Sequence, residues 1–162
     1  MPGIEQSAGE RFRTLPDLAW LADGSNLEEA RYRELVAGGW CWVAEDDEGR
    51  PCAFLAAEAM GEELHICELG VVLNCQRLGI GRALVETAIA AATRCHIAAI
   101  TLTTFIDVAW NAPFYERVGF QRLASDDLGP RLQALLRYEV EAGLPRDRRC
   151  AMRLALPIRR QP

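Results

Sequence analysis

Apolar side chains in the first forty residues recur at the spacing of amphipathic helices. One or two short helices are expected over residues 11–22, where a phenylalanine and three leucines follow one another every third position. Another helix is expected over residues 27–37. Asn26 is a suitable N-cap for this helix, and Gly38 and Gly39 can end it.

The pattern then becomes that of a sheet. Residues 40–44 and 51–60 are apolar segments joined by an acidic stretch that contains a glycine, which predicts a β-hairpin. A turn follows. Residues 64–72 then predict a largely buried central strand, because leucine, isoleucine and valine dominate them.

The second half of the chain alternates helices with strands. Small and apolar residues from 80 to 94 recur at helical spacing, which predicts a helix that lies close against a sheet. The other expected elements are a strand over 98–103, a short helix over 111–117, a strand over 120–123, a helix over 130–142 and a strand over 150–156. Asn111 can cap the short helix, and Gly119 can end it.

The chain has 162 residues, half of them hydrophobic, which is enough for one domain with a sizeable core and too few for two ordinary domains. We expect a single domain over residues 1–162, with disorder only at Pro2–Gly3 and Arg159–Pro162. No apolar stretch reaches the roughly 20 residues of a membrane span, and residues 1–13 lack the apolar core of a signal peptide. A cytoplasmic protein is therefore expected.

Cysteine and charge narrow the function classes. The six cysteines form no Cys-x-x-Cys pair and no cluster of zinc-ligand spacing, so we expect buried free thiols and no metal site. Residues 1–68 hold fifteen acidic residues and five arginines, whereas residues 69–162 hold eight acidic residues and thirteen arginines. This division suits a protein that binds an anionic cofactor and a cationic acceptor. The overall acidity disfavours nucleic-acid binding. All eighteen basic residues are arginine, so the chain has no side-chain ammonium to acylate itself.

The most informative stretch is Gln76–Ala83, which follows the central strand and opens the helix over 80–94. Gly79 and Gly81 let the main chain approach a ligand closely, and the start of the helix adds unpaired N–H groups and a partial positive charge. An anion such as a pyrophosphate is the natural ligand, although a Gly-x-Gly pair alone fits a tight turn equally well. The spacing matches neither a P-loop nor a Rossmann dinucleotide site.

A second segment lies about thirty residues further on and runs from Thr101 to Phe120. With the glycine loop it resembles the GNAT superfamily of acyl-CoA-dependent N-acyltransferases. The pattern of that family is a strand, a Q/R-x-x-G-x-G/A loop with its helix, another strand, and an Asn-x-x-x-Tyr segment that ends in Gly-Phe. Residues 76–81 match the loop at every defined position. The resemblance is specific over residues 64–123, and within the family it is similar to bacterial acetyltransferases without an assigned substrate.

The resemblance implies an α/β (α+β) fold, with a mixed, mostly antiparallel twisted sheet flanked by helices on both faces and with splayed central strands. It also implies acetyl-CoA as the acyl donor. The loop amides would bind the pyrophosphate, and the strand edge would pair with the pantetheine amides. The implied cofactor-binding residues are Leu69, Val71, Val72, Gln76, Arg77, Leu78, Gly79, Ile80, Gly81, Arg82, Ala83, Asn111 and Phe114.

Two positions leave alternatives open. An N-cap role would explain Asn111 as well as a cofactor contact does. The family often has a proline two residues after the position of Val71, and here Leu73 and Asn74 follow Val72 instead. This difference affects the stiffness of the loop more than the backbone amides that would bind the cofactor, so cofactor binding is still expected.

Tyr115 matches the family position whose hydroxyl protonates the leaving thiolate, which implies a catalytic acid. A base is also needed, because an ammonium has no lone pair for attack. Glu68 is the first candidate, since burial in an apolar strand would raise the pKa of its carboxyl, and a water could relay the proton. An outward-facing Glu68 is the alternative. His65 would suit because the pKa of an imidazole is ordinarily near neutrality. It is the second candidate, because it lies three positions before Glu68 and a regular strand would point the two in opposite directions. A covalent intermediate on Cys67 or Cys75 is discounted, because direct transfer needs none.

These features predict an N-acetyltransferase that moves an acetyl group from acetyl-CoA to a primary amine by direct attack. The acidic first part of the chain favours a small cationic acceptor, and a protein N-terminus or lysine is the alternative. A non-catalytic acyl-CoA-binding sensor or interaction module is the alternative class. A homodimer is left open, and neither a membrane nor a nucleic-acid partner is expected.

Overall fold

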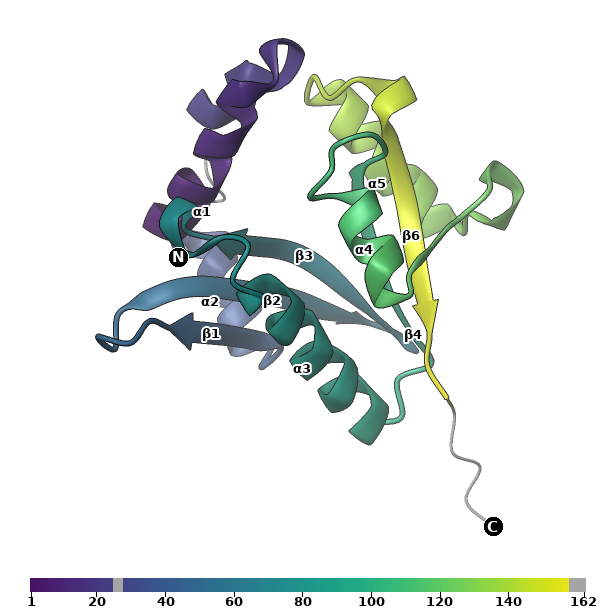
Figure 1. Cartoon of the computed structure of the whole chain (residues 1–162). Coiled ribbons are helices and arrows are strands. Elements are labelled where there is room, and N and C mark those ends of the chain that lie inside the picture. The colour runs from purple at the N-terminus through teal and green to yellow at the C-terminus, as the bar shows by residue number, and fades with distance from the viewer. Residues whose placement is uncertain (25–27, 158–162) are drawn as a thin grey trace. The chain divides into compact units, whose positions relative to one another are not determined.

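The computed structural model describes residues 1–24 and 28–157 (Figure 1). The α-helices in this part of the chain are α1 (Pro2–Gly9), α2 (Glu29–Ala37), α3 (Ile80–Arg94), α4 (Ala112–Val118) and α5 (Pro130–Glu141). The strands are β1 (Cys41–Glu45), β2 (Pro51–Met60), β3 (Glu63–Val71), β4 (Ala99–Phe105), β5 (Gln121–Arg122) and β6 (Arg149–Ala155). Short 3-10 helices are η1 (Glu10–Thr14), η2 (Pro16–Asp23), η3 (Leu73–Cys75), η4 (Ser125–Asp127) and η5 (Arg146–Arg148). The hydrogen-bonded strand order is β1-β2-β3-β4-β6-β5.

The chain divides into two compact units. The first unit comprises Met1–Met60 and Ile66–Ala91, and the second comprises Gly61–His65 and the chain from Ala92 onward. Strand β3 belongs to both, since its first three residues lie in the second unit and the rest lie in the first. The expectation of a single domain concerns how the units join, and it stays a prediction.

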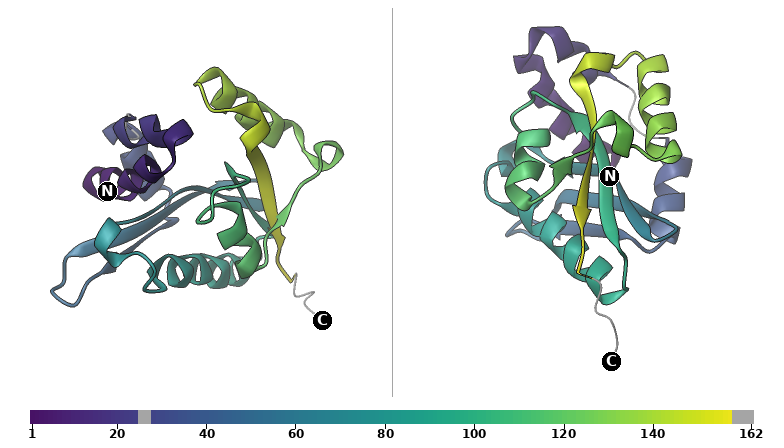
Figure 2. Two further views of the ribbon diagram at one scale, coloured as in Figure 1. Left: turned by 45° about the horizontal axis from the view of Figure 1, so that its top comes forward. Right: turned by 90° about the vertical axis from the view of Figure 1, so that its right-hand side faces the viewer.

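The first unit is a sheet with helices on both faces (Figure 2). Strands β1 and β2 form an antiparallel hairpin in which Cys41 lies opposite Ala56. Phe54 and Ala56 of β2 pack against Tyr32 of α2 and Ile4 of α1. Helix α3 covers the opposite face (Figure 2). Six consecutive residues of β2, from Cys52 to Ala57, are buried, because both faces of the strand are covered.

The second unit is built around β4 and β6. These strands are antiparallel, and Leu102 lies opposite Met152 in the buried centre of the pair. The first residues of β3 add a parallel strand, with Leu64 opposite Ile100, and β5 extends the antiparallel side. Helices α4 and α5 lie on opposite faces of the β4–β6 pair (Figures 1 and 2). The predicted fold, a mostly antiparallel sheet flanked by helices, is therefore confirmed.

Most predicted elements are confirmed with ends shifted by one or two residues. The segment 11–22 is helical, but it forms the 3-10 helices η1 and η2 and not an α-helix. The backbone of Leu15 is extended between them, because a residue that precedes a proline, here Pro16, disfavours the helical conformation. The expected N-cap Asn26 lies outside the described residues.

Two expectations were wrong. Pro2 and Gly3 are ordered in the first turn of α1, where a proline suits the first helical position and the following Ile4 is buried. The expected disorder of Arg159–Pro162 lies outside the described residues. The six cysteines are free, but burial holds fully only for Cys52 and Cys150, while Cys95 is exposed. Among the described helices, none is both long and apolar enough to cross a membrane.

Candidate functional site

The glycine loop joins the end of β3 to α3 within the first unit. Arg77 and Gly79 both have left-handed backbone angles, with φ values of 64° and 84°. Glycine adopts this conformation without steric cost, whereas an arginine rarely does. Helix α3 begins at Ile80, has no acidic residue in its first turn, and leaves its first N–H groups without intrahelical partners. Because residues 77–79 are exposed, these amides are available to an anion.

Side chains hold this loop in place. The Gln76 amide donates to the Val71 carbonyl (Nε2 to O, 3.0 Å), and its Oε1 accepts a hydrogen bond from Arg11 (Nη1 to Oε1, 3.2 Å). The Leu73 N–H donates to the Ser7 hydroxyl oxygen at 3.1 Å. Neither Arg11 nor Ser7 was predicted from the sequence, because both lie in a segment without a motif. The loop is therefore tied to the N-terminal helices.

Arg82 is exposed on the first turn of α3 and forms an ion pair with Glu86 (Nε to Oε1, 2.7 Å). Such an exposed pair contributes at most about 1 kcal/mol. A phosphate can therefore compete with Glu86 for the guanidinium.

The last residues of β3 face two different layers. A Cβ added to Gly81 of α3 would lie 3.5 Å from Val71 and 4.0 Å from Leu69, so these two side chains face α3. A Cβ added to Gly70 would lie 2.9 Å from the Phe54 ring, so position 70 faces the other layer. The predicted cofactor residues Leu69 and Val71 thus share one face with the start of α3.

Strand β3 is irregular just before this point. Cys67 packs against the same cluster, formed around Tyr32 and Phe54, that Gly70 faces. Residues three apart in a regular strand face opposite sides, so the alternation breaks between Cys67 and Gly70, as it does at a β-bulge. The spacing argument that separated His65 from Glu68 assumed a regular strand, and the break between Cys67 and Gly70 does not test it, so it stays a prediction.

Glu68, the proposed base, is half-buried in this irregular part of β3. The nearby Tyr32 hydroxyl is buried and donates a hydrogen bond to the Glu5 carboxylate. Burial raises the pKa of Tyr32 above its usual value, and so do the bond to Glu5 and the negative charge of Glu68. Two carboxylates therefore act on one buried hydroxyl in the first unit.

Burial raises the pKa of the neighbouring Cys67 thiol to about 11, although Arg31 opposes the shift. A thiol that stays protonated at neutral pH is a poor nucleophile. The environment of Cys67 thus agrees with direct transfer.

His65, the second candidate base, is buried in the second unit. Its Nδ1 lies 3.0 Å from the Thr101 hydroxyl, which also accepts a hydrogen bond from Arg131 (Nη2 to Oγ1, 3.0 Å). Arginine can only donate, so it uses one lone pair of the hydroxyl, and the hydroxyl can still donate to Nδ1 or accept from it according to the tautomer of His65. The imidazole is therefore engaged with Thr101.

The same face of the second unit carries two ion-pair groups that the sequence did not indicate. Glu63 pairs with both Arg131 and Arg153, at 3.0 and 3.1 Å. Glu139 of α5 binds Arg149 with both carboxylate oxygens at 2.9 Å. The second pair is almost completely buried, and it fixes α5 to β6.

Helix α4 holds the second group of predicted site residues. Asn111 occupies the N-cap position, but its side chain makes no capping hydrogen bond. Its Oδ1 is buried without a hydrogen-bond partner among the described residues. Tyr115 is 7% exposed and packs edge-on against Phe114 and Phe120, with ring centroids 4.9 and 5.5 Å away. Asn111 therefore occupies the N-cap position, but the explanation that its side chain caps α4 is wrong. Its Oδ1 remains an acceptor at the start of the helix that carries Tyr115.

The predicted residues thus fall into two groups. Glu68, the strand residues 69–72 and the loop residues 76–83 belong to the first unit, while Asn111, Phe114 and Tyr115 belong to the second. Each group is assembled within its own unit.

The order of these parts defines the class of protein. A central strand, an open glycine loop, a long helix, another strand and a short helix with a buried tyrosine follow one another along one mixed sheet. This is the order expected of an acyl-CoA-dependent acyltransferase. The model of the acetyltransferase (GNAT) domain family matches residues 37–122, more than half of the chain, and the chain belongs to this family.

Solved structures with the same fold include several acetyltransferases. The ribosomal-protein-S18-alanine N-acetyltransferase of Escherichia coli is 20% identical, with a TM-score of 0.62, and the match covers 99% of this chain and 87% of that one. The N-acetylglutamate synthase of Neisseria gonorrhoeae, solved with coenzyme A and N-acetyl-glutamate, is 15% identical with a TM-score of 0.66, over 91% of this chain and 32% of that one. A putative streptothricin acetyltransferase of Bacillus anthracis, solved with acetyl coenzyme A, is 20% identical with a TM-score of 0.57, over 72% and 62% of the two chains.

Proposed function

We propose that this acetyltransferase moves an acetyl group from acetyl-CoA to the primary amine of a small cationic molecule. The observation that carries the proposal is the glycine loop. Its left-handed Gly79 and its exposed residues lead directly into the first turn of α3, as a phosphate-bearing cofactor requires.

The chain's own residues suit acetyl-CoA in both units. No atom of the described residues lies within 4 Å of a Cβ placed at Gly79, so the backbone there is open to the pyrophosphate. The buried Asn111 Oδ1 is an acceptor that an N–H or O–H group of the cofactor arm would satisfy. Two of the similar structures above hold coenzyme A or acetyl coenzyme A. The other proposed contacts are Leu69, Val71, Val72, Gln76, Arg77, Leu78, Ile80, Gly81, Arg82, Ala83 and Phe114.

Acetyl-CoA supplies an activated thioester, and the chain supplies the proton transfers. In the proposed mechanism Glu68 removes a proton from the acceptor ammonium, directly or through a water, which frees the lone pair for attack. Backbone amides near Val71 polarise the carbonyl as the C–N bond forms. The C–S bond breaks, the acceptor nitrogen loses its second proton to solvent to give the amide, and Tyr115 donates its hydroxyl proton to the leaving sulfur and regains a proton from solvent.

We favour Glu68 over His65 as the base for two reasons. Glu68 is half-buried, so its carboxylate can reach a substrate, whereas the His65 imidazole is buried and engaged with Thr101. The irregular strand around Glu68 is also a feature that often accompanies active sites.

The proposal of a cationic acceptor rests on charge. Residues 1–68 are strongly acidic, and the carboxylates of Glu5 and Glu68 both act on the Tyr32 hydroxyl. The acceptors named for the similar structures differ from one another, so they do not select one for this chain. A protein N-terminus or lysine is the alternative acceptor; the E. coli enzyme, whose match at 20% identity spans 99% of this chain, is named for an alanine of ribosomal protein S18. A cytoplasmic, bacterial setting and a homodimer stay predictions.

Replacing Tyr115 with Phe tests the mechanism. We expect kcat to fall about 100-fold, because general acid catalysis commonly contributes that much, while the Kd of acetyl-CoA changes by less than about twofold. Turnover is measured by release of the CoA thiol, and affinity by calorimetry. Tyr138→Phe is the matched control, because Tyr138 is 68% exposed on α5. Equal losses of turnover and affinity in Tyr115→Phe would contradict an acid role.

The enzyme class has its own test. The purified protein is incubated with acetyl-CoA and a broad panel of polyamines, aminoglycosides and peptides. Release of thiol with a cationic small amine supports the proposal. Tight binding of acetyl-CoA without thiol release for any member would indicate the sensor class instead.

A further inference from the structure

Two cysteines of the first unit, Cys52 of β2 and Cys75 of η3, are hydrogen-bonded through their main chains to the same residue. The Val72 N–H donates to the Cys52 carbonyl oxygen at 2.9 Å, and the Cys75 N–H donates to the Val72 carbonyl oxygen at 2.9 Å. The start of β2 and the segment that leads into the glycine loop are therefore joined through Val72.

Cys52 occupies a break in the pairing of β2 with β1. The residues of β2 that are paired with β1 pass from Ala53 directly to Pro51, so the register skips Cys52. An extra residue of this kind is a β-bulge, which re-aims its side chain. The Cys52 thiol shares a side-chain hydrogen bond with the Cys75 thiol. Backbone and side chains together bring the two sulfur atoms close to one another, as disulfide formation requires.

The two thiols differ in their access to solvent. Cys52 is 2% exposed and is the first of six consecutive buried residues of β2, whereas Cys75 is half-buried. A small oxidant in solvent therefore reaches Cys75 and not Cys52. Burial raises the pKa of the Cys52 thiol, and the neighbouring Cys75 adds to the shift. Cys75 is therefore the thiol that reacts first, and Cys52 is the thiol that completes the disulfide.

The residue that follows Cys75 orients the glycine loop. Gln76 donates to the Val71 carbonyl at 3.0 Å and accepts a hydrogen bond from Arg11 of η1 at 3.2 Å. The loop amides begin directly after this residue. A movement of Cys75 therefore acts on both Gln76 bonds and on the amides behind them.

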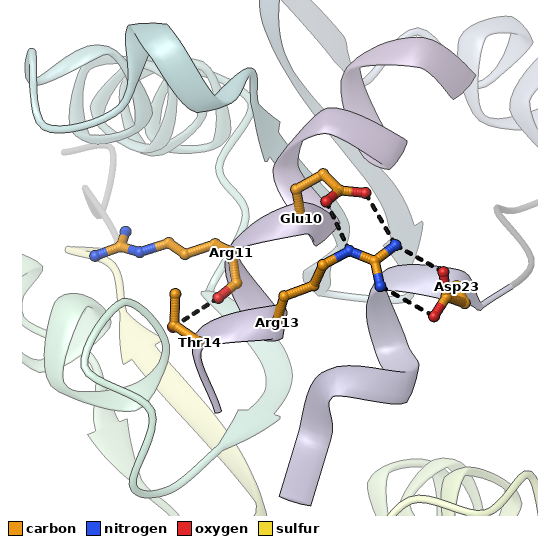
Figure 3. Close-up of polar contacts among 5 residues, drawn as sticks. All are labelled: Glu10, Arg11, Arg13, Thr14 and Asp23. Carbon is orange, nitrogen blue, oxygen red and sulfur yellow. Dashed lines mark hydrogen bonds and ion pairs between the residues drawn. The ribbon is translucent and has the colours of Figure 1, made fainter. Parts of the chain in front are cut away.

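The segment that carries Arg11 has contacts of its own (Figure 3). Arg13 of η1 lies 2.8 Å from Glu10 (Nε to Oε2) and 2.7 Å from Asp23 of η2 (Nη2 to Oδ1). These bonds join η1 to η2, so η1 does not simply follow the loop. A displacement of the neighbouring η3 would therefore stretch the contacts of Gln76 instead of carrying them along.

We propose that Cys52 and Cys75 form a reversible disulfide that lowers the affinity of the glycine loop for coenzyme A. The inference rests on the proposed use of acetyl-CoA and adds a modification site beside the loop. A covalent bond brings two sulfur atoms closer together than a hydrogen bond does. Because the residues of β2 from Cys52 onward are buried and closely packed, the loop side moves toward the strand, and the loop amides lose their alignment with the pyrophosphate.

A low-molecular-weight disulfide such as oxidised glutathione is the oxidant. The Cys75 thiolate attacks one of its sulfur atoms, which forms a mixed disulfide and releases one glutathione thiolate that takes up the proton lost by Cys75. The Cys52 thiolate then attacks the Cys75 sulfur, which forms the internal disulfide and releases the second glutathione as a thiol. Two cysteine thiols are oxidised, and one glutathione disulfide is reduced to two thiols.

Mass spectrometry of the full chain tests the disulfide without turnover. The reduced wild type is incubated with oxidised glutathione, digested without reductant and mapped. We expect a linked pair of peptides that contain Cys52 and Cys75, with the mass of two hydrogens lost and no glutathione retained on either residue. A mixed disulfide that persists on Cys75, or a disulfide of either residue with a third cysteine, would overturn the inference.

Three variants assign the two roles. Cys52→Ala should stop at the mixed disulfide and keep glutathione on Cys75, because the second thiol is missing. Cys75→Ser should form no linked pair, and Cys52 should stay reduced because it is buried. Cys95→Ser is the matched control: Cys95 is exposed and belongs to the second unit, so its loss should leave the rate of disulfide formation unchanged. Oxidation of Cys52 in Cys75→Ser at the wild-type rate would contradict this order of events.

Calorimetry then measures the effect on the loop. Coenzyme A is titrated into the reduced and the oxidised wild type after glutathione is removed. We expect the Kd to rise about 5-fold or more on oxidation, because the loop amides lose their alignment, and to return to its first value after treatment with dithiothreitol. In Cys75→Ser the same treatment should leave the Kd unchanged. An equal Kd in the two forms of the wild type would overturn the inference.

Folding is checked by thermal melting of each variant. If Cys52→Ala melts early, the comparison of the wild type with Cys75→Ser decides alone, since Cys75 is only half-buried. Reduced wild-type protein that binds coenzyme A but transfers no acetyl group would count against the proposed function and leave the disulfide inference standing. Reduced wild-type protein that does not bind coenzyme A would overturn both, even where the disulfide forms.

Discussion

A buried acceptor atom without a hydrogen bond costs about 1–3 kcal/mol, and Asn111 Oδ1 is such an atom within the part of the chain that the structure describes. The neighbouring backbone is not short of contacts, because the Asn111 carbonyl already accepts bonds from Phe114 and Tyr115. The cost therefore belongs to the side chain alone. A ligand that donates to Oδ1 would recover it as binding free energy.

Asn111→Ala should therefore separate folding from binding. We expect the free energy of unfolding to rise by about 1–3 kcal/mol, because no capping bond is lost and the buried unpaired acceptor is removed, whereas loss of a true cap costs about 1 kcal/mol. The affinity for coenzyme A should fall about 5-fold or more. Urea denaturation and calorimetry measure the two quantities. Asn111→Ser is the check: serine is a good cap, so a variant stabilised relative to Asn111→Ala would favour the capping role.

Among the elements, the glycine loop depends on its two glycines for different reasons. Gly79 has a φ of 84°, which an L side chain rarely adopts. Gly81 has no such angle, and a Cβ there would make ordinary contacts with Val71 and Leu69. At Gly79 the backbone conformation therefore restricts which residue can be accommodated. At Gly81 only the space beside Val71 and Leu69 does so.

Gly79→Ala and Gly81→Ala form a matched pair of variants. Gly79→Ala should cost about 1–2 kcal/mol of stability, because the left-handed conformation is unfavourable for alanine, and it should weaken binding of coenzyme A as the loop amides turn. Gly81→Ala should change stability by less than about 0.5 kcal/mol. Thermal melting and calorimetry provide the readouts. Similar losses in both variants would refute this division of roles.

The helices and strands that could be predicted from the sequence were those with a clear spacing of apolar residues or a recognisable turn. Alanine and leucine spacing located α3 to the residue, and the acidic turn with Gly49 located the β1–β2 hairpin. Residues 11–22 were harder, because 3-10 and α-helices share similar periodicities over so few residues. The break in β3 at Cys67 was beyond reach, since an irregular strand leaves no mark in the sequence when its neighbours are apolar on both faces.

At the scale of the whole molecule, the candidate site could be named from the sequence only where a motif exists. The loop residues and Tyr115 were named from the sequence, while Arg11, Ser7 and the pair of Tyr32 and Glu5 were not. The partners in these contacts are 65, 66 and 27 residues apart. Such pairs depend on how the chain folds back, and a single sequence carries no signal for them.

Titration behaviour is another whole-molecule property. Burial raises the pKa of Cys41, Cys52, Cys67 and Cys150, and Tyr32 shifts in the same direction. The chain has no lysine, so the usual ammonium titration near pH 10 is absent. A raised pKa in the folded state means that the neutral group favours folding. That stability is complete below the unfolded pKa and is lost as pH rises toward the folded pKa.

The free energy of unfolding should therefore fall in alkali, above the pKa that the thiols have in the unfolded chain. For Cys67 the window runs from 9.0, its ordinary value, to about 11. We expect the free energy of unfolding to be constant from neutral pH to about pH 8.5 and to fall steadily above that. Urea denaturation across this range measures it, and Cys67→Ala should show a shallower decline. An equal slope in the variant would show that Cys67 does not contribute.

One close approach described above ties two strands together. Position 70 on β3 has no side chain, and the ring of Phe54 on β2 fills the space that a Cβ would need, at 2.9 Å. The two positions share one volume, so neither can change alone without a clash or a cavity. Among descendants of this sequence we expect them to be inherited as a pair. A lineage that gains a side chain at position 70 should first, or at the same time, have exchanged the aromatic ring at position 54 for something smaller.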